Sequence, residues 1–143
     1  MGGVLMRGQI ENRGRKQQII DFSGLRFGTI TPTDIDGVIE YRGKAFIYYE
    51  FKYQDAPVKR GQQIAFEETV ISHLKAGRKA IVMILEHDIH DCKNDIQAAN
   101  CRVREFYLVP EKGWVKPKAN ETAHSLTQKF FEEVEKKVRS GVD

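Results

Sequence analysis

The sequence predicts an α/β fold in which a mixed central sheet is flanked by helices. Three observations lead to this prediction. Segments 33–41 and 45–53 are rich in β-branched, aromatic and apolar residues, and the short glycine-containing turn 42–44 joins them, which is typical of a β-hairpin. A stretch with helical spacing of apolar residues follows at 62–76. The continuous apolar run 80–85 then has the length of a strand that is covered on both faces.

The remaining elements complete this architecture. Residues 9–20 are polar and mixed in charge, and we expect a first helix there, ended by a turn at 22–25. Segment 103–109 predicts a further strand, and the polar stretch 87–101 connects it to the preceding one. Apolar residues recur at helical spacing from Leu126 to Val138, which predicts a terminal helix. The expected order is helix, hairpin, helix, strand, strand, helix.

Length and composition limit the class of protein. At 143 residues the chain has the length of one domain, and we expect residues 1–143 to fold as a single domain. No segment approaches the roughly 18 apolar residues of a membrane span, so we expect no membrane association. Met1–Gly8 lacks the apolar core of a secretory signal, which predicts a cytoplasmic protein with Cys92 and Cys101 as free thiols. The net charge of +3 permits nucleic-acid binding without requiring it.

Charged residues coincide with the predicted hairpin. If the turn consists of the three residues 42–44, it sets Asp36 opposite Glu50 and Asp34 opposite Lys52. A two-residue turn would shift this pairing by one residue. Three carboxylates gathered on one patch are costly unless a cation compensates their like charges, and oxygen ligands without His or Cys suit Mg²⁺ or Mn²⁺. Such a site supports hydrolysis of a phosphodiester, because the metal lowers the pKa of a bound water and Lys52 can orient that water or stabilise the phosphorus centre.

These residues resemble the motif of a known nuclease superfamily. Asp36, thirteen intervening residues and then Glu50-Phe51-Lys52 are similar to the PD-(D/E)XK motif of restriction-endonuclease-like nucleases. The common core of that superfamily is a helix, a hairpin that carries the motif, a crossover helix and a further strand. The resemblance implies metal-dependent cleavage of DNA, less often RNA. It also implies that Asp36, Glu50 and the backbone carbonyl of Phe51 hold Mg²⁺ or Mn²⁺, with Lys52 as the catalytic lysine.

The motif departs from the superfamily pattern at one point. Three residues separate Pro32 from Asp36, so the Pro-Asp dipeptide is not intact, and Asp34 remains the alternative metal ligand. In some members a glutamate on the first helix adds a ligand and a glutamine on the crossover helix braces the site. The candidates for these positions are Glu11 and Gln62.

The resemblance also suggests how the substrate is held. Lys59 and Arg60 precede the crossover helix and are candidates to contact phosphate, although a solvated loop explains them too. Because cutting both strands of DNA takes two sites, a homodimer stays open. By analogy of fold, a small endodeoxyribonuclease of this kind fits a phage protein or an enzyme of DNA repair and recombination.

Other interpretations of the same residues stay open. The charged group could be a structural salt-bridge patch, its two carboxylates could act on a glycosidic bond, or the fold could bind nucleic acid without cleaving it. Trp114 could stack on a base, although a lone Trp more often packs against the core. A zinc site would need residues whose spacing fits no established zinc geometry, namely His87, His90, Cys92 and Cys101.

Overall fold

The computed structural model describes residues 8–11, 14, 18–91 and 93–140. The chain divides into two compact units, Met1–Pro32 and Thr33–Asp143, and each is described by itself. Within the described residues, no helix has both the length and the apolar character that a bilayer span requires.

The described residues of the first unit contain turns and one β-bridge, and Gly14 is helical. The turn predicted at 22–25 is present, because the Leu25 N–H donates to the Phe22 carbonyl at 2.9 Å. Phe27 and Ile30 then form an antiparallel bridge through two backbone hydrogen bonds of 2.9 and 3.0 Å.

The helix predicted over 9–20 is wrong at both of its ends. Residues 9–11 and 18–20 are not helical, whereas residues 12–13 and 15–17 lie outside the described part of the chain. Ile19 is 94% exposed and Ile20 is 73% exposed. These side chains therefore supply no buried apolar face, which is what stabilises most helices in proteins.

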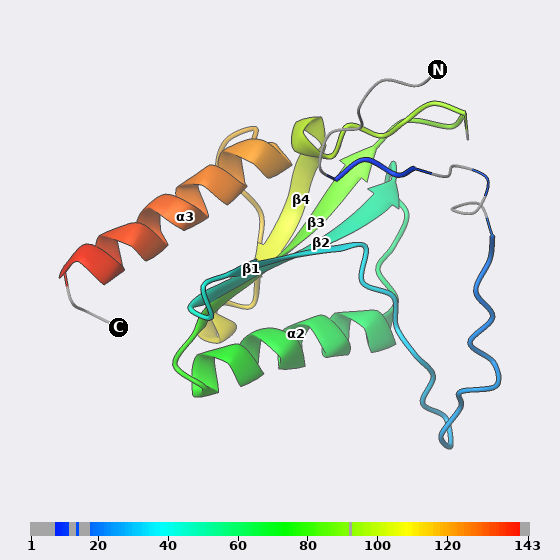
Figure 1. The fold of residues 1–143 in the computed structure, drawn as a ribbon, viewed down its shortest axis with the longest axis horizontal. Coiled ribbons are helices and arrows are strands. Elements are labelled where there is room, and N and C mark those ends of the chain that lie inside the picture. The colour runs from blue at the N-terminus through cyan, green and yellow to red at the C-terminus, as the bar shows by residue number, and fades with distance from the viewer. Residues whose placement is uncertain (1–7, 12–13, 15–17, 92, 141–143) are drawn as a thin grey trace. The chain divides into compact units, whose positions relative to one another are not determined.

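The second unit is built on a five-stranded mixed sheet (Figure 1). The strands lie side by side in chain order, as β1 (Gly37–Tyr41), β2 (Ala45–Tyr53), β3 (Lys79–His87), β4 (Arg102–Tyr107) and β5 (Trp114–Val115). β2 and β3 run parallel, and the other neighbouring pairs are antiparallel. A parallel pair needs a crossover connection, and α2 (Arg60–Lys75) provides it.

The hairpin of β1 and β2 has the predicted register. Tyr41 pairs with Ala45, which leaves residues 42–44 as a three-residue turn. Arg42 and Gly43 have positive φ angles of 51° and 67°. Turns with two such residues twist in the same sense as the strands they join, so the local sequence favours this hairpin.

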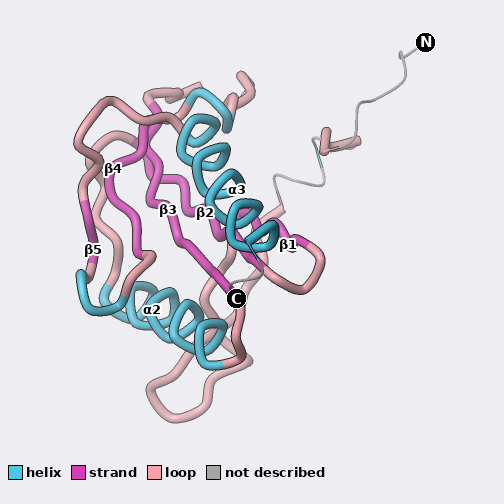
Figure 2. The backbone as a smooth tube through the Cα atoms, turned by 90° about the vertical axis from the view of Figure 1, so that its left-hand side faces the viewer, coloured by secondary structure: helices cyan, strands magenta, loops and turns pink. Residues whose placement is uncertain are grey.

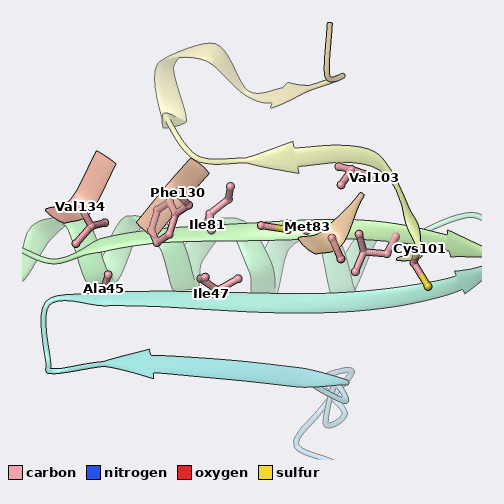
Figure 3. Close-up of a cluster of buried hydrophobic side chains, with 10 residues drawn as sticks. Ala45, Ile47, Ile81, Met83, Cys101, Val103, Phe130 and Val134 are labelled. Carbon is pink, nitrogen blue, oxygen red and sulfur yellow. The ribbon is translucent and has the colours of Figure 1, made fainter. Parts of the chain in front are cut away.

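Helices cover both faces of the sheet (Figures 1 and 2). α2 packs on one face, where its Phe66 and Val70 are buried in a cluster with Ala80, Val82, Ile84 and Tyr107. α3 (Ala123–Ser140) packs on the other face. The core there joins β2, β3, β4 and α3, as Figure 3 shows, through Ala45, Ile47, Ile81, Met83, Val103, Phe130 and Val134. Short 3₁₀ helices, η1 (Ala98–Asn100) and η2 (Pro110–Lys112), lie in the connections around β4.

The α/β class and the order of elements from the hairpin onward are confirmed. The predicted strand 45–53 is β2, the predicted helix 62–76 is α2, and the predicted strands 80–85 and 103–109 are β3 and β4. β5 was not predicted, because a two-residue strand is too short to show periodicity.

The first predicted strand is shorter than expected. The sequence predicts an extended segment over 33–41, but β1 begins only at Gly37. Just before this point the Asp36 side chain, rather than its backbone, accepts the hydrogen bond from the Phe51 N–H of β2. A short polar side chain that replaces a backbone partner in this way ends regular pairing. Asp34 and Asp36 therefore lie in the segment that leads into β1, not within the strand.

Candidate functional site

The candidate site lies on the sheet face that α2 covers, at the end of β1 where the hairpin ladder stops. Continuing the ladder by one residue sets Asp36 opposite Glu50. Asp36 is exposed, and its Oδ2 accepts a hydrogen bond from the Phe51 backbone N–H at 2.9 Å. This contact holds the Asp36 carboxylate beside the strand that carries Glu50 and Lys52.

Glu50 is buried, with 4% of its surface exposed. Its Oε1 accepts a hydrogen bond from Gln62 Nε2 at 2.9 Å and lies 3.2 Å from Lys52 Nζ. Its Oε2 is buried and has no hydrogen-bond partner among the described residues. A buried polar atom left in this state costs about 1–3 kcal/mol, and nearly all such atoms in folded proteins are paired. The oxygen is therefore placed to receive a ligand from outside the described chain.

The electrostatic surroundings of Glu50 also favour a positively charged ligand. Burial raises the pKa of the Glu50 carboxyl above its ordinary value of 4.5, and the negative charge of Asp36 raises it further. The Lys52 ammonium lowers it through a hydrogen bond and through its charge, but the net shift is upward. A further positive charge between the two carboxylates would favour their ionised forms.

Gln62 links the acidic and basic parts of the site. Its Nε2 donates to Glu50 and its Oε1 accepts from Lys52 Nζ at 3.1 Å. Gln62 lies in the first turn of α2, so the crossover helix places this amide over β2. The Lys52 side chain is only 18% exposed. The ammonium is therefore held at the site by two contacts instead of extending into solvent.

The backbone of Phe51 faces the same edge of β2. A residue in an antiparallel ladder directs both its N–H and its carbonyl to the same neighbouring strand. Because the Phe51 N–H points to Asp36, its carbonyl is directed to the side on which Asp36 lies. The β1 ladder ends before this residue, so β1 does not pair with it.

Asp34 does not join this group. Asp34 is exposed and precedes β1, so its predicted pairing with Lys52 across the hairpin is wrong. Among the residues that the structure describes, no group of three or more His, Cys, Asp or Glu side chains is arranged to hold a metal ion. The predicted third carboxylate is thus not gathered with Asp36 and Glu50. Glu11 is exposed and belongs to the first unit, and its role as a ligand stays a prediction.

The atoms at the site fit a hard divalent cation. Mg²⁺ and Mn²⁺ take oxygen ligands, and proteins commonly supply one or two carboxylates while water and substrate complete the coordination. Asp36, Glu50 and the Phe51 carbonyl would form such a set. The buried, unpartnered Oε2 of Glu50 is the observation that favours a cation here.

Two basic residues lie at the start of the crossover helix. Lys59 is the residue before the first turn of α2, in an extended conformation, and Arg60 is the first helical residue. Both side chains are exposed. None of the ion pairs in the described part of the chain involves either residue. They are therefore available to a negatively charged ligand near the helix N-terminus, which itself favours anions.

A further charged group adjoins the site and has no counterpart in the sequence predictions. Glu86 lies opposite Lys52 in the β2–β3 register and accepts hydrogen bonds from Arg102 and, at 2.6 Å, from Arg104 Nε. Arg104 also donates to the Gln54 carbonyl at 3.0 Å, which ties β4 to the end of β2. A register shift between β3 and β4 lets Arg104 reach these groups, and no residue pattern signals such a bulge.

Of the residues considered for zinc, the three that the structure describes, His87, His90 and Cys101, do not form a group that could hold a metal ion. The structure has a hydrogen bond of 2.5 Å between His90 Nδ1 and the Tyr53 hydroxyl. Cys101 is a buried free thiol, and Cys92 lies outside the described residues.

Trp114 packs within the fold. Its ring lies 5.3 Å from that of Tyr107, and its Nε1 donates to Glu67 of α2 at 2.7 Å. These contacts favour packing of Trp114 within the fold over stacking on a base, and they tie β5 to α2.

Comparison of the chain with family models, with curated proteins and with solved structures finds no match. The case for a function therefore depends on the geometry of the residues described above.

Proposed function

We propose that this chain is a metal-dependent nuclease of the PD-(D/E)XK type that hydrolyses phosphodiester bonds in DNA with Mg²⁺ or Mn²⁺. The observation that carries the proposal is the buried Oε2 of Glu50, which accepts no hydrogen bond from the part of the chain that the structure describes and lies in a site with Asp36, Lys52 and Gln62. The order of elements supports it. A hairpin, a crossover helix and a strand parallel to the second hairpin strand form the order expected for the restriction-endonuclease-like core.

The carboxylates and the Phe51 carbonyl would hold the cation at the open end of the hairpin. A bound Mg²⁺ would lower the pKa of a coordinated water and neutralise charge that develops on the phosphate. Asp36 is exposed while Glu50 is buried, so the two carboxylates span the boundary between solvent and the sheet. A phosphate approaching from solvent would therefore meet the exposed Asp36 carboxylate first.

Lys52 would act on the attacking water or on the phosphate. Gln62 and Glu50 fix its ammonium within 3.2 Å of a carboxylate oxygen, so its position is set before substrate binds. A preorganised positive charge stabilises the negative charge that builds up in the transition state. Lys59 and Arg60, both exposed at the start of α2, would bind the phosphates of the flanking DNA.

The direct test is a cleavage assay of the full chain with plasmid, single-stranded, branched and RNA substrates in Mg²⁺, Mn²⁺ or EDTA. We expect cleavage of DNA that depends on Mg²⁺ or Mn²⁺ and stops in EDTA. Lys52→Ala should lower turnover by about 10² to 10⁴, the range for a positioned charge or proton-transfer group. Lys75→Ala is the matched control, because Lys75 is an exposed lysine at the end of α2 that lies far from Gln62.

Each outcome separates the proposal from an alternative. DNA binding without cleavage in either metal would indicate a non-catalytic nucleic-acid-binding module. A Lys52→Ala protein that melts far below wild type, when wild type cleaves nothing, would indicate that the charged group is a structural salt-bridge patch.

A further inference from the structure

A cavity of about 770 Å³ opens beside the candidate site and has no role in the proposed hydrolysis. It is lined by the two residues that follow β2, the end of β3, the connection that leads to β4 and the first residue of β4. One of its lining residues is Glu86, which lies opposite Lys52 in the β2–β3 register. Gln54, two residues after Lys52, also lines it and is fixed by a hydrogen bond of 2.8 Å from its N–H to the His87 carbonyl. The cavity is thus contiguous with the strand that carries the proposed catalytic lysine.

The polar lining is rich in hydrogen-bond acceptors. Three amide side chains, Gln54, Gln97 and Asn100, line the cavity together with the carboxylates of Asp55, Asp88, Asp95 and Glu86. Arg102, which also lines it, is paired with Glu86. The excess of carboxylates repels a phosphate, whereas ionised carboxylates and amide oxygens accept hydrogen bonds from N–H groups. The described carboxylates that line the cavity are not among the buried oxygens without a hydrogen bond, so the feature that favours a cation at Glu50 is not found here.

Apolar and aromatic surface borders these acceptors. Ile89 and Ile96 line the cavity and are 40% and 42% exposed, so the face of a planar ring can pack on them. Tyr53 is 41% exposed, although its ring contacts both His87 and His90 at centroid distances of 5.8 and 5.7 Å. His87 also lines the cavity, so the Tyr53 ring is in contact with one of the lining residues. A ring held in this way offers a face on which a base can stack.

We propose that this cavity binds an unpaired nucleobase of the DNA, one whose edge carries an amino group, next to the phosphate that is cleaved. The inference rests on the proposed nuclease function, and it adds a substrate class: DNA in which paired and unpaired regions meet. A base within a duplex has its edge paired and its faces stacked, so it cannot enter a cavity lined by acceptors. A free cytosine or adenine edge supplies the N–H donors that the carboxylates and amides accept.

Binding is measured by fluorescence anisotropy with the full wild-type chain in EDTA, so that no substrate is cleaved. The probes are a blunt duplex and the same duplex extended by an unpaired tail of cytosine or of thymine, which lacks the amino group. We expect the cytosine tail to tighten binding by a factor on the order of 10 and the thymine tail to do so less, as one well-placed base contact implies. Equal affinity for all three probes would overturn the proposal.

Variants locate the effect in the cavity. The double variant Asp55→Asn with Asp88→Asn should remove the preference for cytosine, whereas Glu68→Gln, which changes an exposed charge on α2, should leave it. Tyr53→Ala should weaken binding of both tails and Tyr53→Phe should not, because stacking needs the ring alone. Circular dichroism checks that each variant folds. If a variant does not fold, the comparison of tails on wild type still decides.

The two proposals fail in different ways. Cleavage in Mg²⁺ with no preference between tails refutes the cavity proposal and leaves the nuclease proposal intact. Absence of both DNA binding and cleavage refutes both. Binding of a basic peptide but not of a tailed duplex would assign the acidic lining to a protein partner, and that result also overturns the cavity proposal.

Discussion

Replacing Glu50 by glutamine tests whether its unpartnered oxygen awaits a cation. The glutamine side chain keeps the size of the glutamate and an oxygen for Gln62 and Lys52, but it removes the negative charge. Without metal, the wild type holds a buried carboxylate whose Oε2 has no partner among the described residues. We therefore expect metal-free Glu50→Gln to be more stable than wild type, and the order to reverse in Mg²⁺.

The expected magnitudes follow from the contacts of Glu50. The variant removes a charge that burial and the neighbouring Asp36 disfavour, but it also weakens the attraction to Lys52, which lies 3.2 Å from Oε1. Its NH₂ group takes the place of Oε2, so the gain comes from the lost charge and not from a new hydrogen bond. The net gain without metal is therefore about 1 kcal/mol. At a Mg²⁺ concentration about 100 times the dissociation constant, a cation bound only by the folded wild type adds about 2.7 kcal/mol. Wild type should then exceed the variant by about 2 kcal/mol, or roughly 6 °C in Tm for a domain of this size.

The pH dependence provides a second measurement of the same group. Burial and Asp36 raise the pKa of the Glu50 carboxyl in the folded protein, so the folded state holds that proton more tightly than the unfolded state does. The resulting stability is fully present below the ordinary value of 4.5 and is lost as the pH rises through the raised folded value. The metal-free difference between wild type and Glu50→Gln should therefore vanish below pH 4.5 and appear above the raised pKa.

Thermal melts of both proteins, with Mg²⁺ and with EDTA across this pH range, measure all of these quantities. Glu68→Gln, at an exposed position of α2, controls for the loss of one negative charge. An equal gain in Tm from Mg²⁺ in wild type and in Glu50→Gln would refute the assignment of Glu50 as a ligand. So would a wild type that does not respond to Mg²⁺ or Mn²⁺ at all.

The remaining predictions concern binding and positioning. Asp36→Asn should weaken Mn²⁺ binding in calorimetry, and unchanged binding would remove Asp36 from the metal ligands. Gln62→Ala should lower turnover by about 10 to 100-fold with Mg²⁺ still bound, because the variant loses a group that orients a metal ligand. Turnover equal to that of wild type would show that the contacts of Gln62 with Glu50 and Lys52 are only structural. The double variant Lys59→Ala with Arg60→Ala should reduce the slope of log affinity against log salt by about 2 without changing turnover at saturation, and an unchanged slope would identify both as solvated charges.

The elements that the sequence predicts well are those set by local interactions. The turn at 42–44 and the composition of 45–53 fix the hairpin and its register, and this register alone sets Asp36 opposite Glu50. The crossover helix follows from its own spacing of apolar residues, and its start brings Gln62 near the hairpin. Most of the candidate site is therefore predictable, because its residues lie on two neighbouring strands and on the helix that directly follows them.

The features that were missed depend on tertiary contacts. Asp34 was expected on a strand, but the Asp36 side chain ends the ladder and leaves Asp34 outside it. The contact of Arg104 with Glu86 needs a shift in the β3–β4 register, and β5 needs the packing of Trp114 against Tyr107. None of these can be derived from periodicity, since each depends on which strands meet.

The balance of charge distinguishes a cation site from a structural salt-bridge patch. Asp36 and Glu50 carry two negative charges against the single ammonium of Lys52, and Lys52 contacts only Oε1 of Glu50. A buried salt bridge stabilises a fold most when every buried oxygen is hydrogen-bonded, because the cost of burying an unpaired oxygen offsets part of the attraction between the charges. Here Gln62, which could have paired Oε2, instead shares Oε1 with the lysine. With both carboxylates ionised, the described side chains thus leave one buried oxygen without a hydrogen bond and one net negative charge at the open end of the hairpin. A proton on Glu50, whose pKa is raised by burial and by the charge and hydrogen bond of Asp36, offsets that charge in the metal-free protein, and a bound cation would take the place of the proton.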